Sequence, residues 1–297
     1  MLIRKQIPLS YILKNVKYDI IRTILIGLTF HYLTFFYNHL LPEIPFSIPA
    51  FLGTSISVLL SFKLNQSYDR WWEARRVWGE IVNDSRNLVL QLQSFTTGEN
   101  SVQIKAIAYR QIAWCYALGQ SLRGLDATEN LSSFLTEKEI EAVNKHNNKP
   151  LAILQLNSKN IAGLHAENKL DVHSKLIIDL TSARLCDAMG KSERINNTVF
   201  PTSYRIFLHF MIYLFTITLS LALSNMDVWF EIPLLTLLAL SFFLLEKSAD
   251  HIQDPFKNRP NDIPITSIAR TIEINIRQLL GETDVPKVIT AHDYYIL

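Results

Sequence analysis

The chain alternates long apolar segments with polar ones, and four of the apolar segments are long enough to suggest membrane helices. A helix needs about 20 mainly apolar residues to cross the hydrocarbon core of a bilayer. The four segments are Ile20–Leu41, Pro45–Phe62, Ile206–Ser224 and Val228–Leu245. The pattern predicts four transmembrane helices arranged as two hairpins. The alternative is that the same segments are buried helices of a soluble all-α protein.

Positive charge in the connecting segments separates these two alternatives. The links Pro42–Ile44 and Asn225–Asp227 contain no Lys or Arg, whereas residues 1–17 contain four and residues 63–202 contain seventeen. Cytoplasmic segments of membrane proteins carry an excess of Lys and Arg. The distribution therefore favours a membrane protein with both termini and the long middle segment in the cytoplasm.

This topology divides the chain into four parts. Residues 1–62 are expected to hold an N-terminal cytoplasmic segment and the first hairpin, and residues 63–202 a cytoplasmic helical insert. Residues 203–245 would form the second hairpin, and residues 246–297 a cytoplasmic tail.

Helical periodicity continues directly from the second apolar segment into the insert. Apolar or small residues recur at i, i+3, i+4 and i+7 between Val77 and Leu92, so one long amphipathic helix is expected to extend the second span without a turn. Further helices are predicted at Val102–Leu122, Glu137–Asn144, Leu170–Arg194 and Ile265–Leu280, with turns in Gly124–Ser133 and Lys145–Pro150. No strand alternation occurs. The predicted fold class is an all-α membrane protein.

Composition supports this class. Hydrophobic residues make up 48% of the chain and charged residues 19%, below the roughly 25% of an ordinary soluble domain. The formal net charge is only +2 and basic residues are interleaved with acids, so nucleic acid is not expected as a partner. Cys115 and Cys186 lack CxxC spacing, which argues against a disulfide framework or a zinc site. No cofactor is expected, and membrane lipid is the expected surrounding.

Three motifs follow one another over nearly the whole chain. The first is Asn65–Arg75, the second is Glu193–Thr198 followed by Pro201 and Tyr204-Arg205, and the third is Ala249–Phe256 followed by Asn261–Pro264. In order and spacing they resemble the bacterial branch of the bestrophin channel family. The resemblance implies a homopentamer around one central pore, with four transmembrane helices and a large helical cytoplasmic region in each subunit.

The second span carries the candidate pore residues. Thr54, Val58 and Phe62 share one stripe of a helix because they are spaced at i, i+4 and i+8. By resemblance, this stripe forms the hydrophobic neck of the pore, where stacked apolar rings stop ions by dewetting. Thr54 stands where the family usually has a larger apolar residue, so a wetter upper entrance is expected. Packing through small residues is the alternative role for Ser55, Ser57 and Ser61.

The charged helix that follows is expected to be structural rather than to contact ions directly. Its candidate residues are Arg70, Trp71, Trp72, Glu73, Arg75 and Trp78. The tryptophans present more aromatic area than water would tolerate, so burial between subunits or at the membrane interface is expected. The Arg and Glu side chains would then bond across subunits.

Two further sites concern metal ions. Asp250, His251 and Asp254 could form a metal site, although the same residues also suit a helix that ends before Pro255. Animal bestrophins carry an acidic calcium clasp after the matching Pro-Phe, but this chain continues with Lys257-Asn258-Arg259-Pro260 and has Asp262 as the nearby acid. Calcium prefers several oxygen ligands, so calcium activation is not expected.

The resemblance to the bacterial branch implies passage of monovalent cations, with an anion-selective channel of the same fold as the alternative. A second narrow point, the cytosolic aperture, is predicted at Val172. A small membrane transporter or a sensor is a further alternative. An enzyme is disfavoured, since the chain has no GxSxG, no HExxH and no phosphate-cradling glycine loop.

Overall fold

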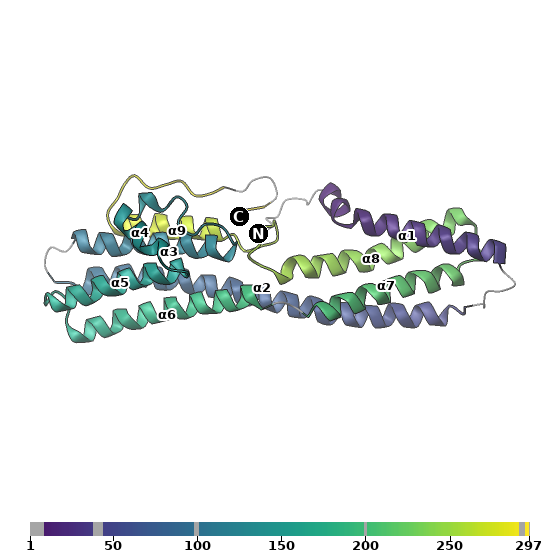
Figure 1. Ribbon diagram of the computed structural model, residues 1–297, viewed down its shortest axis with the longest axis horizontal. Helices are drawn as coiled ribbons and strands as arrows, with labels where there is room; N and C mark the ends of the chain where they lie inside the picture. The colour runs from purple at the N-terminus through teal and green to yellow at the C-terminus, as the bar shows by residue number, and fades with distance from the viewer. Residues whose placement is uncertain (1–8, 38–43, 98–100, 199–200, 291–294, 297) are drawn as a thin grey trace. The chain divides into compact units, whose positions relative to one another are not determined.

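The computed structural model describes residues 9–37, 44–97, 101–198, 201–290 and 295–296, and the regular elements of this described part are helices. They are α1 (Leu9–Tyr37), α2 (Ser47–Phe95), α3 (Ser101–Leu122), the 3-10 helix η1 (Leu131–Ser133), α4 (Glu137–Asn144), α5 (Lys149–Ala166), α6 (Val172–Asn197), α7 (Thr202–Ala222), α8 (Val228–Gln253) and α9 (Ile265–Leu279) (Figure 1). The helical fold class is confirmed.

The chain forms two compact units, and helix α2 contributes to both. The spanning unit comprises residues 5–70 and 199–254, and the second unit comprises residues 1–4, 71–198 and 255–297. The junction predicted from sequence is confirmed, because α2 runs through 49 residues as one helix. Pro49 lies in the first turn of α2, where a backbone N–H would have no partner within the helix, so proline is tolerated there.

The spanning unit contains α1, α7, α8 and the first part of α2. Four helices of the described chain are long and apolar enough to cross a membrane. The unit keeps a small core around Ile56, Ile212 and Phe243, while large apolar side chains such as Trp229 stay exposed. Lipid or a neighbouring subunit would cover such a surface. Residues 38–41 of the first predicted span and residues 42–43 of the following link lie outside the described part.

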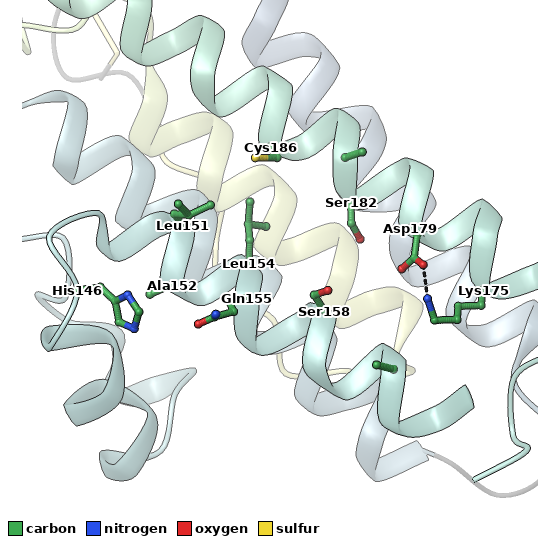
Figure 2. A pocket seen from close by; sticks show the side chains of 12 residues that line it. His146, Leu151, Ala152, Leu154, Gln155, Ser158, Lys175, Asp179, Ser182 and Cys186 are labelled. Atoms are coloured by element: carbon green, nitrogen blue, oxygen red, sulfur yellow. Dashed lines mark hydrogen bonds and ion pairs between the residues drawn. The ribbon is translucent and has the colours of Figure 1, made fainter. Parts of the chain in front are cut away.

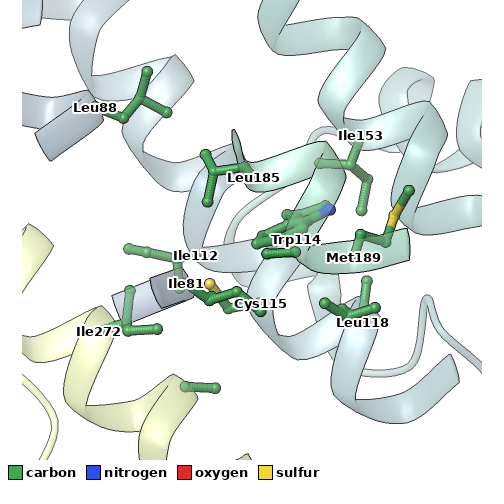
Figure 3. Close-up of a cluster of buried hydrophobic side chains, with 14 of the residues drawn as sticks. Ile81, Leu88, Ile112, Trp114, Cys115, Leu118, Ile153, Leu185, Met189 and Ile272 are labelled. Atoms are coloured by element: carbon green, nitrogen blue, oxygen red, sulfur yellow. The ribbon is translucent and has the colours of Figure 1, made fainter. Parts of the chain in front are cut away.

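The second unit packs around α3. Half of this helix is buried, with side chains on all sides of it in the core, as expected of a central helix. Figure 3 shows Trp114, Cys115 and Leu118 of α3 among side chains of α2, α5, α6 and α9. Burial raises the pKa of the Cys115 thiol to about 12, so this cysteine stays protonated and serves as a small core residue.

Helix α5 was not predicted, and the turn expected at Lys145–Pro150 ends earlier than expected. Asn148 caps α5 by accepting a hydrogen bond from the Leu151 N–H at 3.0 Å. Pro150 lies in the first turn of the helix, where proline is tolerated. A cap residue followed by proline was therefore the available signal, and the prediction read that proline as part of a turn.

The contact between α3 and α9 predicts a sensitive position at Gly119. A Cβ atom at Gly119 would lie 2.6 Å from Cγ2 of Ile265, the first residue of α9. Gly119→Ala should therefore destabilise the protein by about 1–3 kcal/mol through overpacking. Thermal unfolding of the purified protein measures this change.

Gly163→Ala in α5 is the matched control, because a Cβ atom there meets no atom within 4 Å. Alanine should stabilise that helix by up to about 1 kcal/mol. Equal effects of the two substitutions would contradict the packing of α9 on α3.

Candidate functional site

Helix α2 has two different faces within the spanning unit. The buried face contains Leu52, Ile56 and Leu60, none more than 9% exposed. The other face carries Thr54, Val58 and Phe62, of which Val58 is 51% and Phe62 61% exposed. The structure therefore brings the three candidate neck residues together on one face that this chain leaves uncovered.

Three hydroxyl groups near the candidate neck are satisfied within the helix. Thr54 donates to the Ala50 carbonyl at 2.9 Å, Ser55 to Phe51 at 2.9 Å and Ser57 to Gly53 at 2.8 Å. None of these three hydroxyls needs a polar partner on another helix. The exposed face thus remains apolar at Val58 and Phe62.

The three sequence motifs contact one short stretch of α2. Arg70 Nε donates to the Gln253 carbonyl at 3.1 Å within the spanning unit. In the second unit, Trp71 Nε1 donates to the Asn261 carbonyl at 3.1 Å, and Glu73 pairs with Arg194 at 2.7 Å. Contacts inside one chain therefore account for these charged and aromatic residues.

The expectation that the tryptophans are buried between subunits is wrong for Trp78, whose indole is completely buried in the core of its own chain. Trp71 stacks on Trp72 with ring centroids 6.5 Å apart, and Trp72 remains 52% exposed. Arg75 is half-buried on the same helix. Trp72 is therefore the tryptophan of this set with the most exposed side chain.

Helix α6 begins at the predicted aperture residue. Val172 is its first residue and is 65% exposed. Asp171 caps the helix by accepting hydrogen bonds from the N–H groups of His173 at 2.9 Å and Ser174 at 3.1 Å. The bonds from Ser174 hold the pKa of Asp171 below its usual value, so its carboxylate stays charged beside Val172.

Three ion pairs align α6 with α2. Asp84, Glu80 and Glu73 of α2 pair with Arg184, Lys191 and Arg194 of α6 at 2.9, 3.0 and 2.7 Å. Each exposed pair contributes little free energy, about 0–1 kcal/mol. Because all the acids lie on one helix and all the bases on the other, the set fixes the register of the two helices.

The proposed metal residues lie at the end of α8, where Asp254 is the C-cap. Asp250 already has a cation partner, the Lys63 ammonium at 2.6 Å. Among the described residues, no three His, Cys, Asp or Glu side chains are placed so that they could hold a metal ion together. The alternative interpretation, a helix that ends before Pro255, therefore accounts for Asp250, His251 and Asp254 without a metal ion.

A groove of about 600 Å³ lies between α5 and α6 in the second unit. Figure 2 shows Ser158 of α5 opposite Ser182 of α6, with Lys175 and Asp179 of α6 joined as an ion pair. Lys175 and Asp179 therefore neutralise each other within the groove.

Known proteins with similar sequences decide the family. Residues 5–278 match the family described as bacterial/fungal bestrophin protein. This chain belongs to that family. The bestrophin matches an Escherichia coli K12 relative named "Voltage-dependent anion channel-forming protein YneE" at 31% identity over 85% of this chain and 82% of the relative. A Mesorhizobium japonicum relative, named "Voltage-dependent anion channel-forming protein mll4386", is 29% identical over 82% and 78% of the two chains.

The fold of this bestrophin also agrees with a solved structure. The crystal structure of a bacterial bestrophin homolog from Klebsiella pneumoniae aligns with a TM-score of 0.85 and 24% identity, over 91% of this chain and 100% of that one. The bestrophins are an ion channel family, so this bestrophin is a membrane channel protein and not an enzyme.

The loop after α8 contains a carboxyl group that titrates near neutral pH. Asp262 is 1% exposed, and its Oδ2 accepts a hydrogen bond from the Arg259 N–H at 3.0 Å, while Oδ1 is buried without a hydrogen-bond partner. Burial raises the pKa of Asp262 to about 6. Nearby Arg123, whose guanidinium donates to Thr266 at 2.7 Å, offsets part of the cost of ionisation.

We expect Asp262→Asn to stabilise the protein above pH 6 and not at pH 4. The folded pKa of about 6 exceeds the unfolded value of about 3.9, so the wild type loses stability as the pH rises from 4 to 6. Asparagine keeps the acceptor for Arg259 and never ionises, so the gain at pH 8 should be about 1–2 kcal/mol. Thermal unfolding at the two pH values measures it, with Asp187→Asn, an exposed aspartate, as control. A variant that is less stable than wild type at pH 8 would contradict the prediction.

Proposed function

We propose that this bestrophin forms a homopentamer in the inner membrane, with both termini in the cytoplasm and five copies of α2 around a central ion pathway. The observation that carries the proposal is the exposure of Val58 and Phe62 opposite the buried face of α2. Exposed apolar side chains are also common at positions that face lipid. The same face of α2 continues with Asn65 and Asp69, however, and contact with lipid would be unfavourable for these polar side chains. A pathway lined by the same face accommodates both the apolar and the polar part.

The neck works by excluding water. Five copies of Val58 and of Phe62 would form two stacked apolar rings, and a narrow apolar constriction stops ions when it dries. Thr54 would form a third, more polar ring that stays wet. Small rotations of α2 would widen the two lower rings and let water and ions through.

Phe62→Ala and Val58→Ala should each raise the open probability or the conductance. Each substitution changes one ring of five side chains at once in the proposed pentamer, so a gain of about 0.3 kcal/mol per subunit already gives about a tenfold effect. Single-channel recording in planar bilayers measures it. Phe210→Ala on α7 is the control, because Phe210 is also 59% exposed but lies on another helix. Equal currents from all three variants and the wild type would exclude the neck.

The neck carries no charge, so ion selection must occur elsewhere. We place it at Val172, where five copies of the charged Asp171 would favour monovalent cations. The second candidate is anion passage, which the printed names of the relatives at 29–31% identity favour. Both candidates use the same fold and differ only in the sign of the charge that the entrances present.

The channel is proposed to open without calcium. Asp262 is buried and already accepts an N–H, and its neighbour Lys257 is exposed and basic. A calcium site needs several carboxylate and carbonyl oxygens that face a common centre.

The reversal potential under a sodium chloride gradient tests the selectivity. We expect discrete single-channel steps that reverse near the sodium potential, unchanged by micromolar calcium. Asp171→Asn should move the reversal toward zero, while the exposed and distant Asp187→Asn should not. Reversal near the chloride potential would establish the anion candidate, and saturating flux without steps would favour a transporter.

A further inference from the structure

A pocket of about 660 Å³ lies between α3, α9 and the segment around η1, wholly within the second unit. Its volume is in the range of sites that hold small molecules. Each long helix contributes one stripe of its surface, since the lining positions recur at helical spacing. The two stripes are Tyr109, Tyr116 and Gln120 of α3 and Arg270, Glu273 and Arg277 of α9. We name this site the α3–α9 pocket.

A buried carboxylate lies at the centre of the pocket wall. The Glu273 side chain is 6% exposed and accepts a hydrogen bond from the Tyr116 hydroxyl at 2.7 Å. It also pairs with Arg270 at 3.3 Å and with Arg277 at 3.4 Å. Burial raises the pKa of Tyr116 well above its usual value, so its hydroxyl stays protonated and keeps donating. Glu273 is therefore satisfied by the chain itself, and its contacts hold the wall in one arrangement.

The ionic groups around Glu273 carry one positive charge in excess. Arg277 and Lys105 both pair with Glu282 at 2.8 Å, so three cations, with Arg270, face two carboxylates. Arg270 uses Nε alone, which donates to the Tyr116 hydroxyl at 3.0 Å. Among the described residues, its terminal nitrogens Nη1 and Nη2 have no hydrogen-bond partner. The excess charge thus lies on Arg270, with two nitrogens free to bind an anion.

A second incomplete polar group lies one helical turn farther along α3. Oε1 of Gln120 is buried without a hydrogen-bond partner among the described residues. Gln120 follows Tyr116, the partner of Arg270, by four positions, a rise of about 6 Å along the helix. A buried carbonyl oxygen without a donor is unfavourable, and an N–H or O–H group of a ligand would relieve this cost.

Aromatic rings form the apolar part of the pocket. Phe134 stacks on Tyr116 with ring centroids 5.8 Å apart and planes 16° apart, and it meets the Tyr109 ring at 6.1 Å. Such a surface suits the face or edge of another aromatic ring. The remaining acid of the lining, Glu129, is exposed, so water screens its charge from an anion in the pocket.

We propose that the α3–α9 pocket binds a small aromatic carboxylate that carries a hydrogen-bond donor about 6 Å from its carboxylate group. Arg270 binds the carboxylate through its terminal nitrogens, and Gln120 accepts the hydrogen bond from the donor. The aromatic ring packs against Tyr116 and Phe134. This site lies in the second unit, so it goes beyond the proposed ion pathway and does not depend on the neck.

Isothermal titration calorimetry of the purified full-length protein in detergent tests the proposal, with 4-hydroxybenzoate as the probe. Its carboxylate and hydroxyl group lie at opposite ends of one ring. We expect a dissociation constant of about 1 mM or below, as suits a ligand of this size. 4-Hydroxybenzamide, which lacks the negative charge, should bind at least tenfold more weakly. Benzoate, which lacks the donor, should also bind more weakly than 4-hydroxybenzoate.

Variants locate the bound probe. Arg270→Gln should lower the affinity for 4-hydroxybenzoate at least tenfold. Gln120→Leu should lower it to the affinity for benzoate, while the affinity for benzoate itself stays unchanged. Lys159→Gln, which removes an exposed positive charge from α5, is the control and should bind like the wild type.

The absence of wild-type binding at 5 mM 4-hydroxybenzoate would overturn the proposal and leave the pocket as a water-filled gap between two polar helix faces. Equal affinities for the carboxylate and the amide would overturn it too, as would unchanged binding in Arg270→Gln. If Arg270→Gln does not fold, the comparison of the three probes on the wild type and on Gln120→Leu decides.

Discussion

Helix α2 imposes the main constraint on this structure, because one uninterrupted helix of 49 residues has to satisfy two different cores. In the spanning unit it buries Ile56 and Leu60, and in the second unit it buries Trp78 and Ile81. If α2 rotated so that its buried side chains left one core, the exposed face with Val58 and Phe62 would turn with it. Packing on the buried side therefore fixes the direction of the candidate neck, and changes at the neck must be accommodated by the helices that hold α2.

The polar contacts of α2 are arranged where it changes from one unit to the other. Lys63 pairs with α8, Arg70 bonds the end of α8, and Trp71 bonds the loop before α9. Burial provides most of the stability of protein helices, so the exposed sections of α2 receive little stabilisation from hydrophobic packing. The buried Lys63 pair tolerates displacement least, because separating its partners leaves an uncompensated charge. Together with the two directional hydrogen bonds, it specifies one position of α2 more sharply than apolar contacts do.

Much of this architecture could be predicted from local sequence patterns. The four spans, the continuous α2 and helix α4 follow from apolar length and helical periodicity, which are properties of neighbouring residues. Helix α5 was missed because Pro150 was taken as a turn residue rather than as part of a first helical turn. The buried ion pair of Lys63 with Glu246 was missed for a different reason. Lys63 and Glu246 are separated by 183 positions, and each lies at the end of an apolar segment, where a charge normally marks the membrane boundary. Their pairing depends on how α2 and α8 pack, which one sequence does not encode in any local pattern.

The same limit applies to ion selectivity. An apolar neck discriminates by hydration and not by the sign of charge, so even a complete description of Val58 and Phe62 leaves selectivity open. Charges that act on ions must be exposed, fixed and not neutralised by a partner. Lys175 and Asp179 neutralise each other, and the acids of α2 that face α6 are paired with its bases. Asp171 differs, since its partners are backbone N–H groups that leave its full negative charge in place. In the proposed pentamer, the sign of selectivity therefore depends on how near the five copies of Asp171 come to the ion path, and this distance is set by the assembly of subunits rather than by the fold of one chain.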